Sequence, residues 1–413
     1  FFKALKANDS IILNGYQFIN FNKQHIDSLK YYISEFEFKE SQKNIQSYLI
    51  QRLAQIDDSE TMDFYSNFYQ KSYNNSSAQT KILQAISKKE TQASVKDLLD
   101  LMSKDLPLVS SSFEIYQIFK PYMDSLPLAK KLYPEILDYS AIEEYKSPIF
   151  SLLAKLKAEG LVKATSYRKY RKQMLNDAKI QLKRELGKTT KQNNNLYNNF
   201  SVNKKASVLE DYVQLLHPFI HEKEVQLFFN KLDLLKDPDI HTTKAALLAT
   251  SEATKNSKEL YDLAADLKTR NLLFQKLKDA NKSNLFPSEF KTQKDLAEAQ
   301  LFDRKNYDKE QDSIAFITSK TIIYRDKKYN GYVYKFRDGS DYDKNFKMYL
   351  AVYEDSKQLK SKPFYYNNGF RIEDTDTDNE VLEMVLEEFI LKDRQRAEVT
   401  RDNQGLDFGY YDY

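Results

Sequence analysis

The sequence predicts a mainly α-helical protein, in which an array of helical hairpins is followed by a small α+β module with an antiparallel meander. Three observations predict this class. Only eight Gly and nine Pro occur in 413 residues, whereas a doubly wound α/β enzyme needs Gly at its strand-to-helix turns. From about residue 25, apolar side chains recur every three or four residues, the period of an amphipathic helix. Beyond about residue 305, Gly and strand-forming residues replace that pattern.

Residues 1–24 differ in pattern from the helical residues after them. An apolar stretch at 11–13 is followed by Asn14-Gly15 and a second apolar stretch at 16–21, which predicts an N-terminal hairpin. The alternative is that this segment ends a domain lying upstream.

Helices are expected throughout residues 25–188, including 44–56, 58–73, 77–88 and 92–104. Pro107, Pro127 and Pro148 lie 20 and 21 residues apart, and each suits the first turn of a helix. One helix per interval gives a two-helix unit of about 41 residues. Pro121 and Pro134 fall within predicted helices and should kink or split them.

With this spacing, residues 25–300 resemble the HEAT-like α-helical repeat (α-solenoid) proteins, whose repeats are roughly 40–47 residues long. The resemblance implies a surface that binds other macromolecules, and it brings no catalytic residues with it. The alternative is an irregular helical bundle.

Residues 161–188 predict one long helix that ends at Gly187, and the Asn-rich residues 189–203 predict a loop. This loop is the expected internal boundary, after which helical repeats resume over 204–304.

The C-terminal module is expected over 305–395, with strands at 314–323, 329–336 and 346–353 and a helix at 379–392. The first hairpin turns either at Asn330-Gly331 or at Arg325–Lys328. Residues 396–413 predict a tail.

Charge is unevenly distributed along the chain, although the net charge is only +3. Residues 371–413 hold 13 Asp/Glu against 5 Lys/Arg, and residues 163–205 hold 12 Lys/Arg against two acids. A basic stripe that could contact an anionic ligand is predicted on the helix 163–188, at Arg168, Lys172, Lys179 and Lys183. The simpler interpretation is a solvated face whose opposite side (Met174, Ala178, Leu182) packs against other helices.

A second candidate surface for a partner lies near the C-terminus, where Tyr is frequent and acidic residues cluster. Its residues are Tyr365, Tyr366, Asp374, Asp376, Asp378, Tyr410 and Tyr411.

Chemistry-bearing motifs are missing from the sequence, so no catalytic residue, cofactor or metal is expected. Cys is absent, and no GxSxG, Walker or GxGxxG motif occurs. An EF-hand starting at Asp374 would need Gly at residue 379 and Glu at residue 385, where Asn and Val stand. His217 and His221 have a metal-ligand spacing, but Pro218 lies between them and no HExxH motif is present.

We therefore expect a non-enzymatic scaffold that binds one or more proteins, of identity and oligomeric state unknown. One alternative is the accessory region of an enzyme whose catalytic domain lies upstream, since the sequence does not begin with Met. The other is a nucleic-acid or anionic-surface binder, for which nucleic acid is the less favoured ligand. The sequence contains no run of about 18 apolar residues, so no transmembrane segment is expected. The lack of Cys and the Lys/Asn/Tyr-rich composition favour a bacterial cell envelope (periplasmic or surface) or secreted protein, with the cytoplasm as the alternative.

Overall fold

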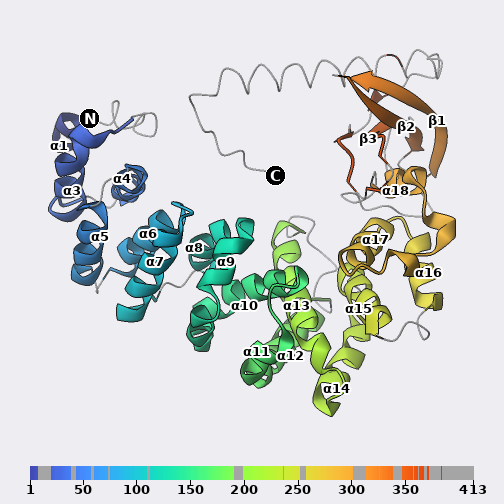
Figure 1. Ribbon diagram of the computed structural model, residues 1–413, viewed down its shortest axis with the longest axis horizontal. Coiled ribbons are helices and arrows are strands. Elements are labelled where there is room, and N and C mark those ends of the chain that lie inside the picture. The colour runs from blue at the N-terminus through green and yellow to red at the C-terminus, as the bar shows by residue number, and fades with distance from the viewer. Residues whose placement is uncertain are drawn as a thin grey trace. The chain divides into compact units, whose positions relative to one another are not determined.

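A computed structural model describes the chain, with its elements labelled in Figure 1, except for residues 8–19, 39–42, 57–59, 73–74, 109–111, 190–198, 236, 252–256, 301–312, 325, 338–346, 357, 361, 367–369, 372–382 and 384–413. It contains two compact units, Phe1–Gln226 and Leu227–Tyr413. The predicted class, mainly α followed by a small module with an antiparallel sheet, is confirmed.

The described secondary-structure elements of unit 1 are all helices. Its elements are α1 (Phe2–Ala7), η2 (Lys23–His25), α3 (Ile26–Ser34), α4 (Lys43–Gln55), α5 (Glu60–Lys71), α6 (Ser76–Ser87), α7 (Gln92–Lys104), α8 (Ser112–Asp124), α9 (Leu126–Leu132), η4 (Glu135–Ala141), α10 (Glu143–Ala158), α11 (Ala164–Tyr167), η5 (Arg168–Tyr170), α12 (Arg171–Thr189), α13 (Asn199–Leu216) and η7 (His217–Phe219). The helix α14 (Lys223–Lys231) crosses into unit 2. The hairpin expected over 11–21 falls outside the described part of the chain, except for residues 20 and 21, which are in neither a helix nor a strand.

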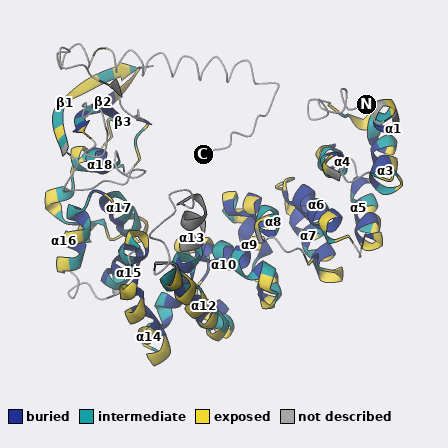
Figure 2. Ribbon diagram, turned by 180° about the vertical axis from the view of Figure 1, so that it is seen from behind, coloured by how far each residue is buried: buried dark blue, intermediate teal, exposed yellow. Residues whose placement is uncertain are grey.

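The helices of unit 1 pack in two rows. In one row α4, α6, α8, α10 and α13 each contact the next, and in the other α5 contacts α7 and α7 contacts α9. The rows meet through α5 on α6, α8 on α9, η4 on α10 and α12 on α13. Helices enclosed by neighbours lose most of their exposure, as Figure 2 shows for α10, whose apolar residues from Tyr145 to Leu156 are largely buried. Alternate helices therefore line the two sides of the array, as in stacked helical hairpins.

The helix pairs do not follow the spacing of the three prolines. The helices α5, α7 and α9 begin at Glu60, Gln92 and Leu126, which are 32 and 34 residues apart. Only Pro127 lies in a first turn, that of α9. Pro148 is inside α10, because the acidic first turn of that helix already begins at Glu143.

The two other prolines behave differently from each other. Pro134 separates α9 from the 3₁₀ helix η4, as expected, whereas α8 continues through Pro121. The array is therefore interrupted between α9 and α10, where η4 takes the place of a longer helix.

Buried Tyr and Gln side chains of α5, α6 and α10 bond to the segment that follows α7, and we call these hydrogen bonds the clasps. The hydroxyl of Tyr69 in α5 donates to the carbonyl oxygen of Asp105 at 2.7 Å, and Gln79 Nε2 in α6 donates to the carboxylate of Asp105 at 2.9 Å. The hydroxyl of Tyr145 in α10 donates to the carbonyl oxygen of Pro107 at 3.2 Å. The clasps give partners to buried polar groups and fix the segment after α7. They account for part of the Tyr content of the chain.

The long helix expected over 161–188 is broken, which corrects the sequence prediction. Tyr167 departs from helical geometry between α11 and η5 (φ −114°, ψ 12°), and its buried side chain donates to the carbonyl oxygen of Leu215 at 3.3 Å. The next helix, α12, runs past Gly187 to Thr189. The expected loop 189–203 is also shorter than predicted, because Thr189 belongs to α12 and residues 199–203 belong to α13. Because α12 packs on α13, the expected boundary lies within unit 1, and the compact units divide at Gln226 instead.

Unit 2 begins with short helices and ends with a sheet. Its helices are η8 (Leu232–Leu234), α15 (Pro238–Ser251), α16 (Ser257–Ala265), α17 (Arg270–Asp279), η9 (Ser283–Leu285), η10 (Ser288–Phe290) and α18 (Gln293–Gln300). Its strands are β1 (Ser313–Tyr324), β2 (Lys327–Arg337), β3 (Lys347–Glu354), β4 (Tyr365–Tyr366) and β5 (Phe370–Arg371). The helix expected at 379–392 and the tail at 396–413 fall outside the described part, except for residue 383.

A buried arginine holds the helices of unit 2 together. Arg270 is 4% exposed, and its Nε donates to the carbonyl oxygen of Ala264 at 2.7 Å, at the C-terminal end of α16. Its Nη1 donates to the carbonyl oxygen of Asp295 and to the carboxylate of Glu298, both at 3.0 Å, in α18. The guanidinium also lies 5.0 Å from the ring centre of Phe290.

The three long strands form the predicted antiparallel meander in the order β1-β2-β3. Because Tyr324 pairs with Lys327, the first hairpin turns between these two residues, where Asp326 has φ +59°. Asn330-Gly331 lies inside β2 instead. A side chain at Gly331 would approach Ile322 Cδ1 to 3.0 Å and Leu350 Cδ1 to 3.2 Å, so close strand packing explains this glycine.

Both faces of the sheet carry buried apolar side chains. On one face Tyr334 and Phe336 pack with Ala297 of α18, and the hydroxyl of Tyr334 donates to the carbonyl oxygen of Lys294 at 2.6 Å. The other face contains a second cluster made of Tyr329, Val333, Met348, Leu350, Val352 and Tyr365. The sheet is therefore part of the core of unit 2.

Candidate functional site

The predicted basic stripe lies on the solvent-exposed side of η5 and α12. Arg168, Lys172, Lys179 and Lys183 are all exposed, and Arg184 and Ile180 lie on the same side of α12. The opposite side of α12 is buried through Met174, Leu175, Ala178 and Leu182. The interpretation that this opposite side packs against other helices is confirmed.

Ion pairs and hydrogen bonds fix α12 at its start. Arg171 forms an ion pair with Glu222 and lies over the ring of Phe219, 5.7 Å from its centre. Gln173 Nε2 donates to the carbonyl oxygen of Ser140 in η4 at 2.5 Å. The basic side of α12 is thus presented by an anchored helix.

Most cations of the stripe have no ion-pair partner among the described residues. Lys179 Nζ lies 3.5 Å from the carboxylate of Glu224. Arg168, Lys172 and Lys183 form no ion pair with any residue that the structure describes. Beside the stripe, hydrogen bonds from Tyr170 and then Lys169 hold the pKa of the Asp138 carboxyl below its usual value. The stripe is therefore a surface of net positive charge.

The C-terminal candidate surface is described only at two residues. Tyr365 in β4 is 6% exposed and belongs to the core of the sheet, so its ring packs inside the protein. The backbone of Tyr366 pairs with Ala351 of β3. Asp374, Asp376, Asp378, Tyr410 and Tyr411 lie outside the described residues.

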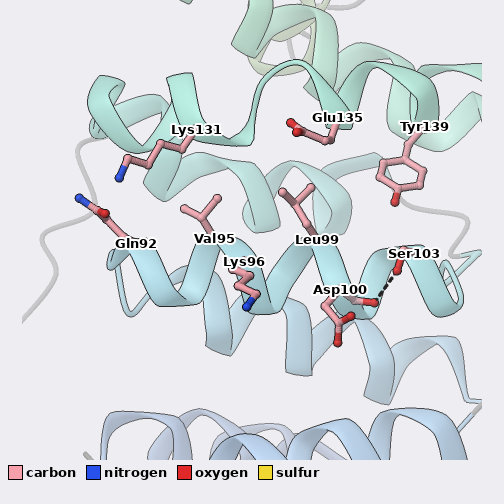
Figure 3. A pocket seen from close by; sticks show the side chains of 9 residues that line it. All are labelled: Gln92, Val95, Lys96, Leu99, Asp100, Ser103, Lys131, Glu135 and Tyr139. Carbon is pink, nitrogen blue, oxygen red and sulfur yellow. Dashed lines mark hydrogen bonds between the residues drawn. The ribbon is translucent and has the colours of Figure 1, made fainter.

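A groove that was not predicted from the sequence lies between α7 and the α9–η4 segment of unit 1 (Figure 3). We call it the α7–η4 groove, and its volume is about 540 Å³. It is lined by Gln92, Val95, Lys96, Leu99, Asp100 and Ser103 on α7, and by Lys131, Glu135 and Tyr139 on the other wall.

The floor of the groove is apolar and its rims are charged. Val95 is 4% exposed and Leu99 is half-buried, and Figure 3 shows their side chains pointing toward the α9–η4 wall. Asp100 pairs with Lys104 at 2.9 Å, while Glu135 and Lys131 form no ion pair with any described residue. Burial, and then the charge of Asp138, raises the pKa of Tyr139. Such a surface can hold an amphipathic segment of another protein.

The α7 wall of the groove could be predicted from the sequence, and the α9–η4 wall could not. The lining residues of α7 are spaced by three and four, within a helix predicted at 92–104. The other wall depends on η4, whose position after Pro134 could not be predicted from periodicity. Lys131, Glu135 and Tyr139 therefore gave no signal as a group.

The described residues bring together no group of three or more His, Cys, Asp or Glu that could hold a metal ion. His217 begins η7 and is partly buried, whereas His221 is exposed. Burial, and then the charge of Lys157, lowers the pKa of His217 to about 4.

Within the described part of the chain, no helix is both long and apolar enough to cross a lipid bilayer. Comparisons with protein-family models, with curated proteins and with solved structures each find no match.

Proposed function

We propose that this chain is a non-enzymatic scaffold that binds a protein partner in the α7–η4 groove. The observation that carries the proposal is the apolar floor at Val95 and Leu99, enclosed by two helical walls with charged rims. Specific protein interfaces combine an apolar centre with a polar rim in this way.

The stacked helix pairs of unit 1 support the view that it is an α-solenoid. A HEAT-like relationship belongs to the same proposal, although the observed intervals of 32 and 34 residues are shorter than the roughly 40–47 of HEAT-like repeats. Grooves between successive helices are a usual binding surface of such arrays.

The test compares two leucines of unit 1. Leu99→Lys places a charge on the floor of the groove, and Leu108→Lys is the matched control, because Leu108 is 63% exposed and lies outside the groove. The tagged full chain is incubated with native extract, and bound proteins are quantified by mass spectrometry. A partner retained by the wild type and by Leu108→Lys but lost by Leu99→Lys supports the proposal. If Leu99→Lys is folded by circular dichroism and retains the same proteins, the proposal is wrong.

The basic stripe favours a second candidate function, binding to an anionic surface through α12. Three of its cations form no ion pair with any described residue, and such cations can contact phosphates. Lys172→Glu combined with Lys183→Glu should abolish binding to vesicles that contain an anionic phospholipid. The control, Lys130→Glu combined with Lys282→Glu, changes two exposed lysines outside the stripe and should leave this binding unchanged. Equal binding by both double variants would exclude this function, and binding to nucleic acid alone would assign the stripe to that ligand.

We also propose a location in a bacterial cell envelope or outside the cell. The support is the absence of Cys, since stray thiols are a hazard in oxidising compartments. Cell fractionation with an antibody against the chain tests this location against the cytoplasm.

A further inference from the structure

Charge is distributed along the α7–η4 groove with a direction. Figure 3 shows Lys131 across from Gln92 at one end and Tyr139 across from Ser103 at the other. Lys96 and Lys131 lie toward the Gln92 end, whereas Asp100 and Glu135 lie further along the groove, before Ser103 and Tyr139. The groove is therefore basic toward the Gln92 end and carries its acidic side chains further along.

The length and the walls of the groove favour a helical occupant. The lining residues of α7 run from Gln92 to Ser103, which at 1.5 Å per residue is about 16 Å, or three turns of helix. Both walls are helical, so their backbone groups bond internally and offer no edge to an extended strand. An amphipathic helix needs only the side-chain contacts that the walls provide.

The α9–η4 wall decides the direction of the occupant. Asp100 is paired with Lys104, which offsets its charge, while Lys131 and Glu135 have no ion-pair partner among the described residues. Acidic side chains are favoured in the first turn of a helix and basic side chains in the last turn. A helix with that ordinary distribution meets both ends of the groove favourably when it runs from the Lys131 end to the Glu135 end.

We propose that the groove binds a short amphipathic helix of a protein partner, acidic in its first turn and basic in its last, lying parallel to α7. The apolar stripe of this helix covers Val95 and Leu99. The inference rests on the proposed scaffold function and specifies the chemistry and orientation of the partner.

Two synthetic peptides of about 14 residues, long enough for the groove, test the inference. Both have the same composition and the same Leu stripe, but one carries Glu in its first turn and Lys in its last, and the other the reverse. Binding of each labelled peptide to the full chain is measured by fluorescence anisotropy. We expect the peptide with Glu first to bind about tenfold more tightly, because its first turn meets Lys96 and Lys131 and its last turn meets Glu135.

A charge swap on one wall provides the decisive variant. Lys131→Glu combined with Glu135→Lys keeps the net charge and replaces two exposed residues, and it should abolish or reverse the preference. Lys130→Glu is the control, because Lys130 is exposed on α9 outside the groove, and it should leave the preference unchanged.

The outcomes separate this inference from the proposed function. Equal binding of the two peptides, lost in Leu99→Lys, would overturn the proposed direction and leave the groove as a binding site. If neither peptide binds while capture of a partner still depends on Leu99, the helical occupant is wrong and the scaffold function stands. If neither peptide binds and no partner depends on Leu99, both proposals fail.

Discussion

Replacing Arg270 with Met should destabilise unit 2 more than any surface change in that unit. The side chain is 5% exposed and holds two helices at once, through carbonyl oxygens of α16 and through Asp295 and Glu298 of α18. The carbonyl oxygens of Ala264 and Ala265 belong to the last turn of α16 and have no later helical N–H to accept from. Met fills similar volume but donates no hydrogen bond.

The expected cost depends on the groups that lose their partner. Removing one partner of a buried ion pair costs about 3–5 kcal/mol, chiefly because the other charge remains buried. The Glu298 side chain is 28% exposed and can be partly rehydrated, so we expect the lower end of that range, about 3 kcal/mol. Arg270→Met combined with Glu298→Met removes both charges and should cost only about 1–2 kcal/mol, through the carbonyl groups that lose their donor.

The assay must report on unit 2 alone, because a chain of two compact units need not unfold in one step. Hydrogen exchange of the α16 and α18 amides, measured as a function of urea concentration, meets this requirement. A loss below about 1 kcal/mol for Arg270→Met would show that the guanidinium does not hold the helices together. If Arg270→Met with Glu298→Met is less stable than Arg270→Met alone, Glu298 is not the charge partner of Arg270.

Three further predictions concern single residues. Burial lowers the pKa of His217 from 6.5 to about 4, so between these pH values the unfolded chain binds a proton at this residue and the folded chain does not. The free energy of unfolding of unit 1 should therefore fall by about 2–3 kcal/mol as the pH falls from 6.5 to 4. His217→Gln should flatten this pH dependence in urea titrations. Gly331→Ala should destabilise the sheet by about 1–3 kcal/mol, since the added methyl approaches Ile322, and normal amide exchange in β2 would contradict it. Tyr69→Phe removes the clasp to Asp105 and should cost about 1 kcal/mol in thermal unfolding, whereas no change in melting temperature would show that the clasp is not stabilising.

The mainly α-helical fold class and the antiparallel meander were predictable from the sequence because both depend on the local spacing of apolar residues. The apolar spacing of residues 92–104 matches α7, and the strand at 329–336 lies within β2. The hairpin turn had two candidates because Asn330-Gly331 fits a tight turn as well as residues 325–326 do. Only the packing of Ile322 and Leu350 against Gly331 shows why a glycine stands inside a strand.

The features that could not be predicted depend on tertiary contacts. The break in the helix 161–188 occurs at Tyr167, whose hydroxyl bonds to Leu215, a residue 48 positions away. The α7–η4 groove joins a regular helix to a 3₁₀ segment whose side chains have no helical period. Of the basic stripe, the sequence predicted the exposed side chains, but not that Arg171 and Gln173 anchor its start.

The clasps have a consequence for how unit 1 is made. They join residues 26 to 38 positions apart, so the helices from α5 to the start of α10 find these polar partners within a limited stretch of chain. Contacts of such range cost little loop entropy and favour rapid folding. This part of unit 1 can therefore fold during synthesis as the ribosome releases it, whereas Tyr167 must wait for Leu215, which is 48 positions later.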